Sequence, residues 1–364
     1  MKILTILQYL ESVAPLSLQE NYDNSGLIFG DPDWETDRVL LCLDLTEEVM
    51  VEAIQKGCRL IISHHPFIFH PIKKFLPELP ETNILTKAIS SQIAIFAMHT
   101  NLDNSLRGLN AFLFNKLGIT SFRILKPQTE TLFKLVAFCP TDYAERVREA
   151  MFKAGAGHIG NYDFCSFNVT GDGSSRAHSE AKPFTGEIDQ VHFEKELRIE
   201  VILPDYARKS VIAALLANHP YEEVAYDIYP LMNTNPLSGA GLIGDLNEPM
   251  NPEKFLQKVK NVIQIPILRH SKLNENPVTK IALCTGSGNF LIPVAQQEKA
   301  DVFLTGDLKY HDFFSVRKNL ILADIGHYES EQWVKEWLYA VLIEKFPTFA
   351  FLISEINTNP VYHL

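Results

Sequence analysis

The sequence lacks the cysteine spacing of a thiolate metal site. It has five cysteines in 364 residues, and no two of them are separated by only two residues. Zinc sites built from thiolates usually show such closely spaced pairs. The cysteines are also odd in number and scattered, mostly inside apolar segments, which argues against a disulfide framework. We therefore expect reduced thiols in the core of a cytoplasmic protein.

Long apolar runs and an excess of positive charge are missing as well. No apolar stretch approaches the roughly 20 residues that cross a bilayer, so no membrane partner is expected. The first residues resemble a signal peptide only briefly, because the apolar positions 3, 6, 7, 10 and 13 describe an amphipathic helix. Lysine and arginine number 33 against 44 aspartate and glutamate, a net charge of -11. Without a basic footprint, nucleic acid is not expected as a partner.

What the sequence does contain is an alternation of apolar strands and helices. Strands are predicted at 38–45, 59–62 and 93–98, with helices at 47–56 and 81–91 between them. The pattern returns with strands at 278–284, 301–304 and 320–323, followed by a long helix through Trp333 and Trp337. Strands that are apolar on both faces are typical of an α/β fold with a mainly parallel sheet flanked by helices.

The middle of the chain has a different pattern. Predicted strands at 132–138, 197–203 and 223–230 alternate with helices at 143–153 and 207–217, an order that resembles a ferredoxin-like α+β unit. The polar segment 173–186 is expected to be mobile. A chain of this length can form two domains. We predict a core domain made of residues 1–126 plus 238–364, interrupted by an inserted α+β domain of residues 127–237.

Two adjacent histidines, His64 and His65, follow the apolar strand at 59–62. Adjacent side chains on a strand point to opposite faces, so both rings can serve one site only if the chain turns there or the site holds more than one atom. Pro66 favours a turn, because it removes a backbone donor and restricts His65 to an extended conformation. The ordinary alternative is a strand end with two partly exposed histidines.

Other possible ligands lie after other predicted strands. Asp103 and His99 follow the strand at 93–98, and His327 and Glu331 are four residues apart at a helix start, where they share one face. Taken singly, each has an ordinary explanation, such as a turn aspartate or a surface pair. Ligands collect beyond the carboxyl ends of parallel strands. Five donors lie there, just past the strands of one predicted sheet: His64, His65, Asp103, His327 and Glu331.

Two glycine-containing turns add polar groups to the same region. Residues 285–289 offer backbone N–H groups suited to an anion, or they form only a tight connection between a strand and a helix. Residues 305–307 are similar, and His311 and Asp312 follow closely.

Several segments resemble a known family. LIISHHPFIF, AMHTNLDN, TGDLKYHD and DIGHYESEQ resemble the signature segments of the Nif-three-like dinuclear metal-centre proteins, also catalogued as GTP cyclohydrolase I type 2 homologs. The resemblance covers nearly the whole chain, including the amino-terminal YDNSGLIFGD. The segments GNYDFCSF and NHPYEEVAYDIYPL resemble the PII/CutA-like domain that longer members carry as an insert.

The resemblance implies a Nif-three-like core with a ferredoxin-like insert, assembled as a toroidal homohexamer with metal sites facing an internal cavity. It also implies that Glu331 bridges two ions. The implied metal ligands are His64, His65, Asp103, His327 and Glu331.

The number of donors agrees with a pair of ions. Five ligands are too many for one tetrahedral catalytic zinc that keeps an open position, and they suit two ions about 3.5–4 Å apart. Imidazole and carboxylate donors without sulfur fit zinc, iron, manganese or cobalt. Two divalent ions outweigh the charges of Asp103 and Glu331, so the site should bind an anionic small molecule or a nucleotide.

Our leading hypothesis is a metal-dependent hydrolase that acts on a nucleotide or another phosphorylated small molecule. His64, Asp103 and Glu331 would hold one ion, and His65, His327 and the shared Glu331 the other. His99 and His311 are candidates for proton transfer or for orienting ligands. The residues expected to position the substrate are Asp307, Ser287 and Asn289.

Two other functions stay open from the sequence. Opening of the GTP ring is implied by the catalogue name, but the sequence shows no recognisable guanine pocket. A protein that only holds metal, or a regulator that senses a ligand or partner through the insert, is the non-enzymatic alternative.

Overall fold

The computed structural model describes residues 1–76, 78–316 and 319–362. The chain divides into two compact units, one made of Met1–Pro127 and Leu237–Leu364 and the other of Gln128–Pro236. Within the described residues, no helix combines the length and apolar character needed to cross a bilayer. All five cysteines are free, and four of them are buried, as the sequence predicts.

The first unit contains a five-stranded sheet with the order β1-β4-β3-β2-β15. The strands β4, β3, β2 and β15 run parallel, and the edge strand β1 is antiparallel to β4. In sequence order these strands are β1 Gly26–Phe29, β2 Arg38–Cys42, β3 Leu60–Ser63, β4 Ala94–Ala97 and β15 Ala350–Ile353.

A six-stranded sheet with the order β11-β14-β13-β12-β10-β5 completes this unit. Its central strands β12, β13 and β14 are parallel, whereas β10 pairs antiparallel with β12 and β11 pairs antiparallel with β14. Its strands are β5 Phe122–Gln128, β10 Asn235–Met250, β11 Arg269–His270, β12 Val278–Ser287, β13 Val302–Gly306 and β14 Ile321–Asp324.

The expectation of a single sheet in this unit is therefore wrong, although the α/β class with parallel central strands is confirmed. Each sheet has an antiparallel strand at one edge, β1 in the first and β11 in the second. One hydrophobic core nevertheless includes side chains of both sheets, among them Leu41 and Ile62 from the first and Leu283 and Leu304 from the second. The two sheets thus belong to one packed body.

Helices cover these sheets because the strands are apolar on both faces. Leu41 faces the shared core, whereas its neighbour Leu40 packs with Val49 and Ala88 on the helices at the opposite face. The amphipathic helix predicted at the start is confirmed as α1, with Ile3, Ile6, Leu7 and Leu10 buried. The helices are α1 Ile3–Val13, α2 Glu47–Gln55, α3 Pro80–Ser91, α4 Thr100–Asp103, α5 Leu109–Lys116, α8 Pro252–Ile263, α9 Ile292–Gln297, α10 His327–Glu331 and α11 Val334–Lys345.

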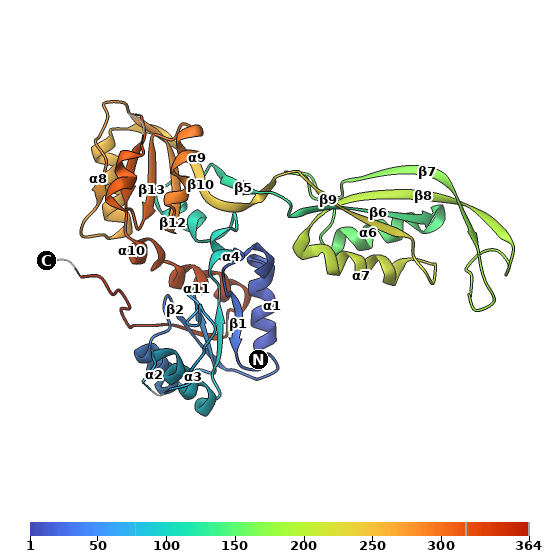
Figure 1. The fold of residues 1–364 in the computed structure, drawn as a ribbon, viewed down its shortest axis with the longest axis horizontal. Coiled ribbons are helices and arrows are strands. Elements are labelled where there is room, and N and C mark those ends of the chain that lie inside the picture. Colours follow the sequence, from blue (N-terminus) through green and yellow to red (C-terminus); the bar gives the residue numbers. More distant parts are fainter. Residues whose placement is uncertain (77, 317–318, 363–364) are drawn as a thin grey trace. The chain divides into compact units, whose positions relative to one another are not determined.

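The second unit has the strand–helix–strand–strand–helix–strand order of a ferredoxin-like fold. Its antiparallel sheet has the order β7-β8-β6-β9, and its two helices lie on one face of the sheet (Figure 1). Leu135, Val201, Val147 and Leu215 belong to its separate core. Its elements are β6 Leu132–Pro140, α6 Ala144–Lys153, β7 Ser166–Arg176, β8 Val191–Pro204, α7 Arg208–Asn218 and β9 Tyr226–Leu231.

One expectation about this unit needs correction. The first part of the polar segment 173–186 is not a mobile stretch, because β7 continues to Arg176 and pairs there with Val191 of β8. Ladder hydrogen bonds hold this part of the strand although its side chains are mostly exposed. The sequence pattern missed it because its polar residues and glycines show no apolar alternation.

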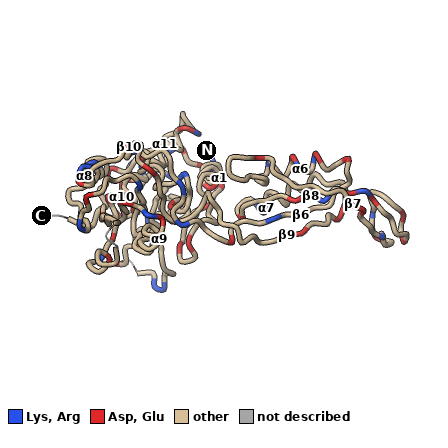
Figure 2. The backbone as a smooth tube through the Cα atoms, turned by 90° about the horizontal axis from the view of Figure 1, so that it is seen from above, with Lys and Arg blue, Asp and Glu red and all other residues tan. Residues whose placement is uncertain are grey.

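Basic and acidic residues are interspersed along the described chain (Figure 2). In this view, the described part of each unit shows no continuous basic strip. This distribution agrees with the acidic composition.

We predict that residues 128–236 fold when expressed alone, because this unit closes its own hydrophobic core. Circular dichroism should show a single cooperative thermal transition. The same unit with Val211→Asp, which places a charge in that core, is the control and should not melt cooperatively. A wild-type unit without tertiary structure would contradict the prediction.

Candidate metal centre

The backbone turns where strand β3 ends, and this turn brings both adjacent histidines to one place. The N–H groups of His64 and His65 both donate to the carbonyl oxygen of Leu43, each at 3.1 Å. The hydroxyl of Ser63 donates to the carbonyl of His65 at 2.8 Å and closes the turn. The two imidazole centroids are 5.0 Å apart. The turn predicted after the strand at 59–62 is confirmed.

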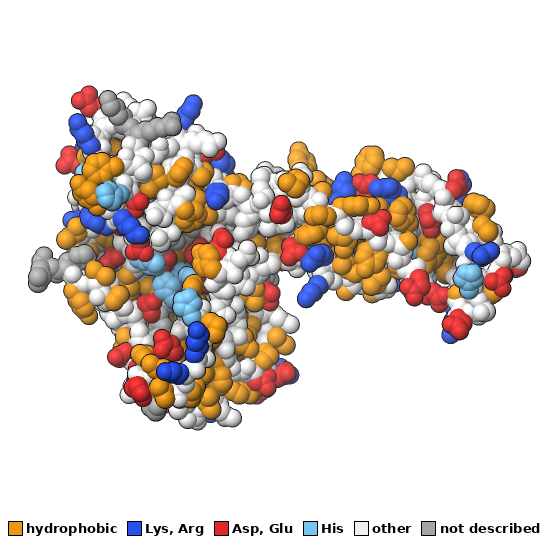
Figure 3. Space-filling model, in the orientation of Figure 1, with side chains coloured by type: hydrophobic (Ala, Val, Ile, Leu, Met, Phe, Trp, Pro, Cys, Tyr) orange, Lys and Arg blue, Asp and Glu red, His pale blue; other side chains and the backbone are white. Residues whose placement is uncertain are grey.

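Strand β4 and the short helix α4 deliver the next two side chains. His99 precedes α4, and Asp103 is its last residue. The His99 ring lies 5.3 Å from the rings of both His64 and His65. A row of histidine side chains is visible on the surface (pale blue in Figure 3), whereas His64 itself is fully buried.

The second sheet supplies His327 and Glu331 through helix α10, which follows β14. The predicted helical spacing is confirmed, and His327 Nε2 lies 2.9 Å from Glu331 Oε2. A Cβ atom on Gly286 would lie only 2.1 Å from Glu331 Oε1, and Gly286 has φ +61°. Glycine is therefore required beside the Glu331 carboxylate.

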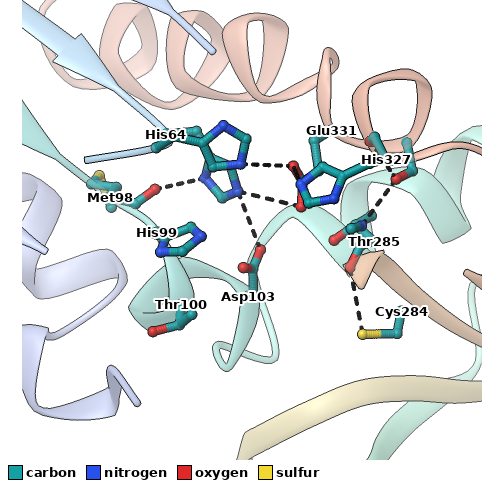
Figure 4. A network of polar contacts seen from close by, with 12 residues as sticks. His64, Met98, His99, Thr100, Asp103, Cys284, Thr285, His327 and Glu331 are labelled. Atoms are coloured by element: carbon teal, nitrogen blue, oxygen red, sulfur yellow. Dashed lines mark hydrogen bonds and ion pairs between the residues drawn. The ribbon is translucent and has the colours of Figure 1, made fainter. Parts of the chain in front are cut away.

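The two oxygens of Glu331 face different donors. Oε1 lies 3.8 Å from His64 Nε2, which is itself 3.8 Å from Asp103 Oδ1. Oε2 lies 3.0 Å from His65 Nε2 and 2.9 Å from His327 Nε2. Figure 4 shows His64 between Met98 on one side and Asp103 and Glu331 on the other. Among the described residues, three groups of donors could hold a metal ion: His64, Asp103 and Glu331; His65, His327 and Glu331; and His64, His65 and His99.

The four histidines of the cluster each have the Nδ1 atom held by an oxygen that can only accept a hydrogen bond. They are His64, His65, His99 and His327. His64 Nδ1 donates to the carbonyl of Met98 at 2.7 Å. The other three donate to carboxylates: His65 to Asp44 at 2.7 Å, His99 to Asp23 at 2.8 Å and His327 to Asp307 at 2.7 Å. A proton on every Nδ1 leaves the Nε2 lone pair of the neutral ring for a metal ion, which is the usual support of metal-binding histidines.

The buried polar atoms fit a cation. His64 Nε2 and Asp103 Oδ1 are buried and lack a hydrogen-bond partner among the described residues. An unsatisfied buried polar atom costs about 1–3 kcal/mol, so two of them side by side are unfavourable in the metal-free protein. A bound cation would remove that cost, and the donor set is consistent with a metal site.

Charges within the cluster shift the titration of its members. Burial raises the pKa of Asp103 to about 7. Burial would also raise the pKa of Glu331, but hydrogen bonds from the surrounding histidines hold it well below its usual range. Burial would lower the pKa of His65 and His327, but their carboxylate partners raise them to about 10 and about 9. In the metal-free protein, protons therefore take the place of metal on these two rings.

The other predicted site residues do not all lie in the donor cluster. Asp307 orients His327 and has φ +57°. His311 lies on the short helix η5 (Tyr310–Phe314), where its ring contacts those of Tyr310 and Phe314, and it belongs to none of the metal-binding groups found among the described residues. Ser287 is exposed and Asn289 half-buried.

The turn at 285–289 is a tight connection in the structure. The N–H of Thr285 donates to Asn110 Oδ1, and that of Gly286 donates to Ser330 Oγ. These two N–H groups are therefore not available to an anion.

Sequence reasoning missed the residues that support the histidines. Asp44 follows β2 just as the histidines follow β3, so the rule about strand ends applied to it too. Asp23 lies in a segment of turn-forming residues and accepts hydrogen bonds from Ser25, His99 and Thr100. No local pattern distinguishes such a carboxylate from an ordinary turn residue.

Comparison with known proteins gives consistent matches along the chain. A sequence profile described as Duf34/NIF3 (NGG1p interacting factor 3) matches residues 1–360. A protein of Halalkalibacterium halodurans named "GTP cyclohydrolase 1 type 2 homolog" is 38% identical over 98% of this chain and 97% of its own length. A Bacillus subtilis protein of the same name is 37% identical over 98% of this chain and 96% of its own.

A solved structure is also similar. The crystal structure of a Bacillus cereus protein related to NIF3 matches with a TM-score of 0.84 and 37% identity, covering 99% of this chain and 98% of that one. The fold described above is therefore found in a solved relative.

We predict that Asp44→Asn weakens metal binding about 10–100-fold, the usual effect of removing a residue that orients a ligand. The substitution removes the negative charge that holds the Nδ1 proton of His65. Metal titrations of the chelator-treated protein measure the change. Asp33→Asn, an exposed aspartate paired with Lys2, is the matched control. Equal metal affinity of Asp44→Asn and Asp33→Asn would contradict the supporting role of Asp44.

The metal-free protein should lose stability as the pH rises from 6.5 to 9. His65 and His327 titrate near 6.5 when unfolded and at about 10 and about 9 when folded. Their contribution to stability is therefore complete below pH 6.5 and is lost as the pH rises through the folded values. Thermal melting after chelation measures this loss. In the double variant with His65→Gln and His327→Gln, the melting temperature should fall less steeply with pH. The same slope in the variant and the parent protein would refute the explanation.

Proposed function

The chain belongs to the Duf34/NIF3 (NGG1p interacting factor 3) family, and we propose that it is a dinuclear metal-dependent hydrolase acting on a nucleotide or another phosphorylated small molecule. The observation that carries this proposal is the position of Glu331. Its two carboxylate oxygens face two separate sets of donors, which is the arrangement of a carboxylate that bridges two ions.

The proposed assignment of ligands follows the distances. His64, Asp103 and Glu331 Oε1 would hold one ion, and His65, His327 and Glu331 Oε2 the other. Nitrogen and oxygen donors without sulfur suit zinc, iron or manganese. Asp44 and Asp307 keep the two histidines of the second set in the tautomer that binds through Nε2.

The chemistry follows from charge and geometry. Two divalent ions held by these residues would supply the polarisation of a phosphoryl oxygen and a lowered pKa of bound water. Asp103 and Glu331 neutralise only two of four positive charges, so the ligands leave a net attraction for an anionic group. His99 adjoins the first set and has its Nδ1 held by Asp23, so we assign its Nε2 the task of moving a proton to or from the reacting group.

Opening of the GTP ring is the other enzymatic candidate, because the curated relatives carry the name "GTP cyclohydrolase 1 type 2 homolog". It needs the same activated water. Hydrolysis of a phosphoester is favoured here because the anionic group of such a substrate is the part that reacts, so the net positive charge of the ligated ions acts on the reacting atoms. The homohexamer expected from the resemblance stays a prediction.

We predict that metal-loaded protein hydrolyses members of a panel of nucleotides and phosphomonoesters, and that Glu331→Gln lowers the rate about a hundredfold or more, because both ions lose a shared ligand. Release of inorganic phosphate measures turnover, and metal content is determined on the same samples. Glu336→Gln, an exposed glutamate of α11 paired with Lys116, is the control.

Three outcomes separate the candidates. Hydrolysis by Glu331→Gln at the parent rate would end the assignment. Release of formate from GTP without phosphate release would favour ring opening instead. Tight metal binding without turnover of any substrate would favour a metal-holding or regulatory protein.

A further inference from the structure

A pocket of about 680 Å³ opens beside the His65 and His327 side of the metal centre. Its volume lies in the range of small-molecule sites. The C-terminal segment forms part of its wall, since Thr358 donates to Asp44 and Asn359 to Glu329. Much of the lining is apolar, and this part is made of Leu43, Ile267, Ile325, Tyr328, Pro360 and Val361.

The charged groups that line the pocket are mostly negative. Four carboxylates border it, those of Asp44, Asp307, Asp324 and Glu329. In Figure 3 acidic side chains border the row of histidines. Arg269 is the one lysine or arginine among the described lining residues, and its guanidinium is bound to Asp324 and to the carbonyl of Leu308.

The sum of charges changes along the pocket. With two divalent ions, the ligands Asp103 and Glu331 leave two positive charges at the metal centre itself. Asp44 and Asp307 offset these two charges in the total, but they bind the Nδ1 side of His65 and His327, away from the metal-facing Nε2 atoms, and Arg269 offsets Asp324. Among the described contacts, Glu329 is held by the neutral amide of Asn359. Bound ions would therefore concentrate positive charge at their own positions, whereas the wall farther along carries the uncompensated charge of Glu329.

We propose that this pocket receives the uncharged organic part of a compact phosphomonoester, whose single phosphate group lies at the metal centre. The proposal rests on the proposed function and narrows its substrate class. A second anionic group remote from the ions, as in a nucleoside triphosphate or a sugar bisphosphate, meets Glu329 and the other carboxylates. An apolar or aromatic group instead buries its surface against Tyr328, Val361 and their neighbours.

Binding of two non-hydrolysable probes to the metal-loaded protein tests this without turnover. The probes are 4-methylbenzylphosphonate and 4-carboxybenzylphosphonate, which share the metal-seeking group and the ring and differ in charge at the far end. We expect the methyl compound to bind about tenfold more tightly, by calorimetry at low ionic strength, because one remote like charge is removed. Glu329→Gln should reduce this difference, whereas Glu344→Gln, an exposed glutamate of α11, should leave it unchanged.

Equal or tighter binding of the carboxylate compound would overturn the proposal, and so would a preference that Glu329→Gln leaves intact. Failure of both probes to bind would also overturn it. Failure of the hydrolase function is a separate result. If the methyl compound binds selectively but 4-methylbenzyl phosphate is not hydrolysed, the pocket assignment stands and the activity does not. Metal content measured after each titration ensures that all variants are compared in the loaded state.

Discussion

The carboxylate of Glu331 is the constraint on which this centre depends. It is buried at the place where strand ends of two sheets meet, and its two oxygens serve two sets of donors. Its helix is tied to the second sheet because Ser330 Oγ accepts from Gly286 and donates to the carbonyl of His327. A side chain at position 286 would occupy the space of the carboxylate. The position of the Glu331 carboxylate therefore depends both on the hydrogen bonds of Ser330 and on the absence of a side chain at Gly286.

The candidate donors can be predicted from the sequence because they follow a simple rule of α/β folds. Apolar strands end, and polar side chains that follow them collect at one edge. His64, His65 and Asp103 were found in this way, and the spacing of His327 and Glu331 added a helical face. The number of sheets cannot be predicted in this way, because the sequence of a parallel strand does not indicate to which sheet it belongs. The antiparallel strands β1 and β10 distinguish the two sheets, and their sequences are short or interrupted by glycine.

The supporting residues could not be found because their roles depend on strand register. Parallel pairing places Cys42 opposite Ser63, so that the turns after β2 and β3 lie side by side and Asp44 reaches His65. A shift of the register would remove this contact while leaving both local sequences unchanged. Asp307 was proposed to contact substrate, yet its contact with His327 needs β13 and β14 as neighbours. Sequence reasoning identifies donors, whereas pairing decides which groups orient them.

Metal binding at such a place is linked to the folding of the whole unit. His64 and His65 extend from the first sheet, whereas His327 and Glu331 extend from the second. Ions held by both sets would cross-link segments more than 200 residues apart. The same residues repel or remain unsatisfied without a cation, as Asp103 and His64 do. The binding free energy of a metal ion held by both sheets would therefore add to the stability of their packing.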